Sequence, residues 1–172
     1  MLRLFTDFEN VPVISVHAGG KIAVTAKAII DPRDLSIAGF YLNYKGEQTI
    51  LLSQDIREIG PSSVVINHEE DLAAPDELIR LQDVLGYNFS PLGKKVATES
   101  GKKLGEVEDY VINDDSWLVQ KIHVHQAAWR SLASSAKIID RNQIVKVDDT
   151  TITVNDASVS MPKTAARPAP IN

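Results

Sequence analysis

The sequence predicts a mainly β protein: two small β-barrels that arose by internal duplication and are joined by a short linker containing one helix. Three observations lead to this prediction. Apolar residues recur at every second position in short runs, turn-forming residues separate these runs, and the whole pattern occurs twice along the chain. Five or six short strands in each half can hide their edges only by closing on themselves, which favours a barrel or a strongly curled sheet.

The duplication is visible as two successive offsets between the halves. An offset of 82 places Ile14, Gly19 and Ile30 on Val96, Gly101 and Ile112. Further along, an offset of 88 places Ile50–Leu51 on Ile138–Ile139 and residues 55–67 on residues 143–155. One insertion explains the difference of six, because residues 125–137 in the second half stand where the first half has only residues 43–49.

The elements follow in order along the chain. In the first unit, residues 1–70, the runs VISV, FYLNY and VVIN predict strands, with turns at HAGG, DPRD and GPSS. A linker follows at residues 71–91, in which Leu78, Leu81 and Leu85 predict a helix from Pro75 to Leu85, stopped by Gly86. The second unit, residues 92–160, repeats the strand pattern. The tail, residues 161–172, is rich in Pro and Ala and is expected to be disordered.

The composition is that of a soluble globular protein. Of the 172 residues, 44% are hydrophobic and 24% are charged, which allows one core in each of the two units. The net charge of −5 does not attract nucleic acid or anionic lipid, so direct nucleic-acid binding is not expected. Asp7 and Glu9 interrupt the first apolar stretch, and no apolar run approaches the roughly 20 residues of a membrane span. We therefore expect a cytoplasmic protein without a membrane span.

The stretch GKKLGEVEDYVIN, residues 101–113, contains two glycines that could belong to a phosphate-binding loop. Gly101 and Gly105 lie four residues apart, which is not the spacing of a dinucleotide or phosphate loop, and no helix is expected after them. Gly101 suits a tight turn, and Gly105 suits a close approach of two backbones. Asp109 interrupts the apolar face of this strand. It is interpreted as a bulge or a hydrogen-bonded side chain, with a buried acid of raised pKa as the alternative.

This stretch, followed by LVQKIHV and later by KIIDRNQIVKV, resembles the PRC-barrel domain in its tandem, bacterial form. The second half matches over residues 92–156. The first half matches less closely over residues 10–70, since Ala23 stands at the place of Gly105 and Lys27 at the place of Asp109. The domain is shared by the photosynthetic reaction-centre H subunit and a bacterial ribosome maturation factor. The resemblance implies a domain that works mainly as an adaptor.

No convergent set of acid, base and nucleophile is recognisable, and small closed barrels leave no roomy cavity. The sequence therefore predicts a non-enzymatic adaptor or scaffold that uses no cofactor and acts through a protein partner. The alternative implied by the resemblance is a ribosome maturation or RNA-processing factor. Such a factor would dock on a basic ribosomal protein, which the net charge of −5 suits.

The candidate partner-binding residues are His123, His125, Trp129 and Arg130. The two histidines are expected on one side of a strand, together with Val119 and Lys121, where they could hold zinc or face a partner. No third ligand is indicated, because the other two histidines, His17 and His68, belong to the other half and are expected to stand alone.

Trp129 and Arg130 lie in the insertion that only the second half carries. Tryptophan and arginine are the residue types that anchor interfaces, and the alternative for Trp129 is to plug the end of its own barrel. Trp117, aligned with Leu35, is expected in the core.

Overall fold

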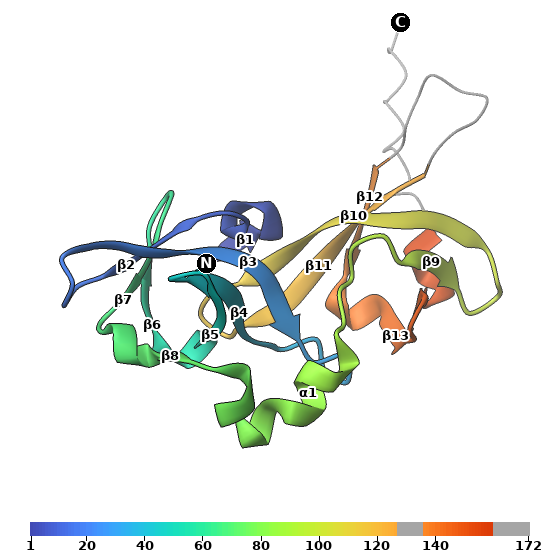
Figure 1. The fold of residues 1–172 in the computed structure, drawn as a ribbon. Helices are drawn as coiled ribbons and strands as arrows, with labels where there is room; N and C mark the ends of the chain where they lie inside the picture. Colours follow the sequence, from blue (N-terminus) through green and yellow to red (C-terminus); the bar gives the residue numbers. More distant parts are fainter. Residues whose placement is uncertain (127–135, 160–172) are drawn as a thin grey trace, which may run out of the picture.

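The computed structural model describes residues 1–126 and 136–159 and shows a mainly β chain arranged in two sheets (Figure 1). The predicted fold class is thereby confirmed at this level. Within the described residues, no helix is long and apolar enough to cross a membrane.

The first sheet has the strand order β6-β7-β2-β3-β4-β5-β8. Its strands β2 and β7 run parallel, and the other pairs are antiparallel. Burial alternates along β2 and along the middle of β3, as a sheet with one covered face requires. The strands are β2 (Pro12–Ser15), β3 (Gly20–Ile30), β4 (Ile37–Tyr44), β5 (Glu47–Leu52), β6 (Ile56–Ile59), β7 (Val64–Ile66) and β8 (Leu72–Ala73).

The second sheet has the order β12-β11-β10-β9-β14-β13, and β1 (Leu2–Leu4) pairs with β10. The N-terminal residues of the predicted first unit thus belong to the second sheet. The remaining strands are β9 (Lys95–Thr98), β10 (Lys103–Asn113), β11 (Leu118–His125), β12 (Ala136–Asp140), β13 (Ile144–Val147) and β14 (Thr151–Val154). Single 3₁₀ turns lie at η1 (Phe5–Phe8), η2 (Ser53–Asp55), η3 (Glu69–Asp71), η6 (Arg141–Gln143) and η7 (Asp156–Val159).

Apart from β1 and β8, the two sheets have the same strand order and the same registers. Val13 lies opposite Val64 in a parallel pair, and Val96 lies opposite Ile152 in the corresponding parallel pair. Val13, and not Ile14 as the offset of 82 predicted, therefore holds the place of Val96. Four residues, 16–19, separate the paired Ser15 and Gly20, whereas three residues, 99–101, separate Thr98 from Lys102, to whose carbonyl the Thr98 amide donates; this difference explains the shift.

Neither sheet closes through hydrogen bonds within the described part of the chain, and one of them is a half-barrel. The prediction of two closed barrels, each with its own core, is replaced by open sheets over one shared core. Phe8 stacks on Phe40 of the first sheet, with ring centroids 5.4 Å apart, and Trp117 from the second half lies 5.9 Å edge-on from Phe40. Trp117 is partly buried against this core, as expected.

Two reciprocal hydrogen bonds join the sheets. The Ile37 amide donates to the Trp117 carbonyl at 2.7 Å, and the Val119 amide donates to the Leu35 carbonyl at 3.0 Å. In the sequence alignment, Ile37 corresponds to Val119 and Leu35 to Trp117, and both Leu35 and Trp117 have positive φ, 59° and 52°. Each half therefore offers the other the same two backbone groups.

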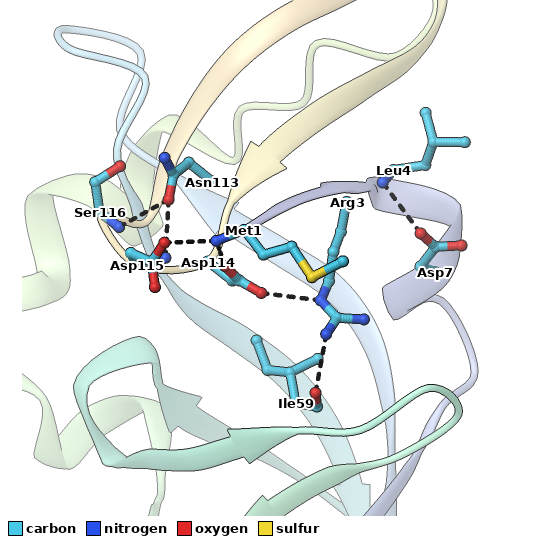
Figure 2. Close-up of polar contacts among 9 residues, drawn as sticks. All are labelled: Met1, Arg3, Leu4, Asp7, Ile59, Asn113, Asp114, Asp115 and Ser116. Atoms are coloured by element: carbon cyan, nitrogen blue, oxygen red, sulfur yellow. Dashed lines mark hydrogen bonds and ion pairs between the residues drawn. The ribbon is translucent and has the colours of Figure 1, made fainter.

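A second connection involves Arg3 of β1, drawn in Figure 2. Its Nε donates to Asp114 Oδ2 at 2.9 Å, and its Nη2 donates to the Ile59 carbonyl of β6 at 3.0 Å. The Met1 ammonium group also donates to Asp114. Burial alone would raise the pKa of Asp114, but the hydrogen bonds from Met1 and Arg3 lower it below the ordinary value.

The linker is helical, but not as one helix from Pro75 to Leu85. It forms two 3₁₀ turns, η4 (Pro75–Glu77) and η5 (Ile79–Leu81), followed by the short helix α1 (Gln82–Tyr87). Asn88, with φ 43°, ends α1, so Gly86 is not the stop. The three leucines of the predicted helix pack on the outer face of the first sheet. The segment that carries them is the green one below that sheet in Figure 1.

Candidate functional site

The glycines of residues 101–113 have structural roles in the second sheet. Gly101 has φ 85° in the turn between β9 and β10. Gly105 has φ 137°, and a Cβ at this position would lie 2.2 Å from the carbonyl oxygen of His125. The predicted turn and the predicted close approach are both confirmed.

Asp109 lies at a register shift between β10 and β11, which confirms the bulge interpretation. Its Oδ1 accepts the Tyr110 amide at 2.7 Å, and its Oδ2 accepts the Thr6 hydroxyl at 3.0 Å. Asp109 thus ties the N-terminal 3₁₀ turn to the second sheet.

His123 and His125 lie on the outward side of β11, as predicted, but Val119 does not share that side. Val119 is fully buried with Ile122 and Val124. A second register shift opposite Val111 and Ile112 inserts one extra residue in β11, which moves Val119 to the inner face.

The outward side of β11 and β12 carries an apolar residue that sequence reasoning missed. Ile138 lies opposite His123 in the register and is 60% exposed. Strand β12 also ends the sheet, so its other edge is unpaired within the described residues. We call His123, His125 and Ile138, together with this edge, the β11–β12 face.

In the first sheet, the surface that corresponds to the β11–β12 face is covered. Ile50, which aligns with Ile138, is fully buried, and β8 pairs with the edge of β5 through Leu72 and Ala73. Leu78, Leu81 and Leu85 pack over the outer face around Ile50. Because the linker occurs only once, after the first unit, the second sheet has no equivalent cover among the described residues. The sequence alignment places Ile50 and Ile138 at equivalent positions, but it does not show that the linker covers only one of them.

Trp129 and Arg130 lie outside the described residues, as does the tail, residues 161–172. Of the four candidate residues, the structure therefore places only His123 and His125, and it places both on the β11–β12 face.

Two open hollows lie along the described residues. One of about 800 Å³ lies where the linker meets both sheets, between Leu78, Leu81 and Trp117. The other, of about 640 Å³, lies beside β9 and β10. Positively charged lysines and negatively charged glutamates both line the second hollow, together with His125. The hollow therefore does not favour a ligand of one charge.

One ion pair of the described residues stabilises the turn after β3. Asp31 accepts two hydrogen bonds from the Arg33 guanidinium Nε and one from Nη2 at 2.6 Å. The hydrogen bond from Arg33 lowers the pKa of the Asp31 carboxyl below its ordinary value, despite partial burial. Within residues 1–126 and 136–159, no group of three or more His, Asp or Glu side chains is arranged to hold a metal ion.

His17 and His68 do not stand alone. Their ring centroids lie 5.0 Å apart, with the ring planes tilted by 40°. The first comes from the turn after β2 and the second from the segment after β7, so the parallel pairing of these strands brings them together.

Comparison with models of protein families and with curated proteins finds no match to this chain. The resemblance to the PRC-barrel domain is therefore a proposal, and function is argued from the surfaces described above.

Proposed function

We propose that this chain is a tandem PRC-like protein, non-enzymatic, that works as an adaptor and binds a protein partner on the β11–β12 face. The single observation that carries the proposal is the contrast between two aligned isoleucines. Ile50 is buried under the linker, whereas Ile138 is 60% exposed beside an unpaired strand edge of the described chain. Exposed apolar side chains at an open edge favour the addition of another segment.

The duplication that makes this comparison meaningful is supported by the registers. The paired residues of β2 and β7 correspond one by one to those of β9 and β14. The reciprocal bonds between Leu35–Ile37 and Trp117–Val119 further support two related halves.

The linker indicates what kind of segment this fold accepts. Two residues of β8 add to the edge of β5, and three leucines then cover the adjoining face. A partner that offers a short extended segment followed by an apolar helical turn would add to β12 and cover Ile138 in the same way. On the β11–β12 face, His123 stands where the first sheet has Tyr41, and Asp140 where it has Leu52, so the partner segment needs polar groups beside its apolar ones.

The test compares Ile138→Glu with Val145→Glu. Val145 is a matched control because it is 55% exposed on β13, a strand at the other end of the same sheet. Proteins captured by the wild-type chain are identified, and one is then produced for measurement of its affinity. Ile138→Glu should weaken this complex by about 2 kcal/mol or more, as at a hot spot, and Val145→Glu should not.

Hydrogen exchange provides the second readout, since added backbone bonds should protect the amides of β12 in the complex. Equal affinities of the two variants, or unchanged exchange in β12, would contradict the proposal. A captured ribosomal protein that binds through this face would favour the ribosome maturation alternative within the adaptor class.

A further inference from the structure

We propose that His17 and His68 form a chelating pair for a divalent transition metal ion of the Zn²⁺, Cu²⁺ and Ni²⁺ class. Imidazole nitrogen is a preferred ligand of these ions. Both side chains are exposed, so an ion can reach them from solvent. This site is separate from the β11–β12 face and does not depend on the proposed function.

The separation of the rings fits a shared ion. Zinc lies about 2.0–2.1 Å from a histidine nitrogen, and a tetrahedral angle at the metal then places two ring centroids about 5 Å apart. The observed separation of 5.0 Å therefore requires rotation of the side chains at most, without movement of the backbone.

The backbone holds the pair in place. The Val16 amide donates to the Ile66 carbonyl and the His17 amide to the Asn67 carbonyl, both at 3.0 Å, which extends the parallel ladder of β2 and β7. The His68 amide donates to Asp71 Oδ2 at 2.9 Å. Two ligands that are already ordered lose little further conformational freedom when an ion binds.

The second half has a different pair at the corresponding place. Ser100 and Asp156 take the positions of His17 and His68, and the Ser100 hydroxyl donates to Asp156 Oδ1 at 2.7 Å. Ser100 and Asp156 thus form a hydrogen bond with each other, whereas the first half presents two side chains that can act as metal ligands. Three acids, Glu69, Glu70 and Asp71, follow His68 directly and favour a cation nearby.

The remaining coordination positions would be filled by water, because no third His, Asp or Glu of the described residues completes the site. We therefore infer a two-histidine chelate with open positions, in contrast to a closed structural metal site.

The experiment titrates Zn²⁺ into the full chain, without an affinity tag, in an isothermal calorimeter. The chain has four histidines, which gives a matched control: His123→Ala/His125→Ala removes the other two. Wild type and this control should bind one Zn²⁺ with equal affinity. His17→Ala and His68→Ala should each weaken binding at least about tenfold, because loss of one ring removes the chelate.

Two further measurements exclude loss of folding as the cause. The melting temperature in EDTA should be the same for all variants, and Zn²⁺ should raise it only where both His17 and His68 are present. Electron paramagnetic resonance of the Cu²⁺ complex should show two imidazole nitrogens in the wild type and one in His68→Ala. Absence of Zn²⁺ binding to the wild type, or loss of binding in His123→Ala/His125→Ala alone, would overturn the inference.

Discussion

Gly101 and Gly105 are alike in the sequence but differ in what surrounds them. Both have positive φ, which glycine adopts without the steric cost that a Cβ brings. Gly101 has open space where a Cβ would stand, whereas at Gly105 the backbone of His125 and Gln126 occupies that space. The identity of Gly105 is therefore set by the contact between β10 and β11 as well as by its own conformation.

This difference predicts unequal costs of two identical substitutions. Gly101→Ala should lower the free energy of unfolding by about 1–2 kcal/mol, the cost of a left-handed alanine. Gly105→Ala should lower it by about 3 kcal/mol or more, because the strands must also separate. Urea unfolding of both variants measures this, and equal losses would show that the two backbones separate without resistance.

At the scale of elements, the longer strands could be predicted because alternation of apolar residues marks a covered face over several positions. The alternation fails at the bulges, which is why Val119 was assigned to the wrong side of β11. The short strands β1 and β8 have three and two residues, too few to show a period. Their pairing depends on distant partners that no local pattern reveals.

The turn between β3 and β4 allows a prediction about pH. Asp31 Oδ1 accepts the Arg33 amide at 2.9 Å, and Asn113 Oδ1 accepts the Asp115 amide at 2.9 Å in the corresponding turn of the second half. Asp31→Asn should therefore keep the turn but lose the ion pair with Arg33.

Because the pKa of Asp31 is lowered in the folded chain, its carboxylate stabilises the fold at pH values above its ordinary pKa, about 4. This contribution is lost as the pH falls through the lowered value. The urea midpoint of Asp31→Asn should thus lie below that of the wild type at pH 7, and the difference should shrink as the pH falls through the lowered pKa. A difference that persists in acid would show that the variant disturbs the turn itself.

At the scale of the whole molecule, the shared core could not be predicted from the sequence. Periodicity identifies inward residues such as Phe40, and the alignment with Leu35 places Trp117 in the core, but neither shows which neighbour buries them. The prediction of one core per unit followed from length and composition, whereas the observed core joins both sheets through the rings of Phe8, Phe40 and Trp117. Of the candidate site, His123 and His125 could be found from their spacing, whereas Ile138 required knowledge of where the linker packs.

A shared core predicts one unfolding transition for the whole chain. Calorimetry should give a single peak, and Trp117→Ala should lower the stability by about 2–3 kcal/mol, since the ring is only partly buried. Hydrogen exchange should show faster opening of both β3 and β10 in this variant. Two separate peaks, or faster exchange in β10 alone, would indicate that the halves unfold independently.

The reciprocal bonds between Leu35–Ile37 and Trp117–Val119 also govern how separate chains can associate. A contact in which each side gives the other the same groups is satisfied by one pair of halves, so a half that is already paired has none of these bonds to offer to another chain. The same reciprocity permits two chains to exchange halves while keeping every bond. The linker opposes this exchange, because its release from the first sheet would uncover Ile50. The bound linker therefore favours closure within one chain over closure between two.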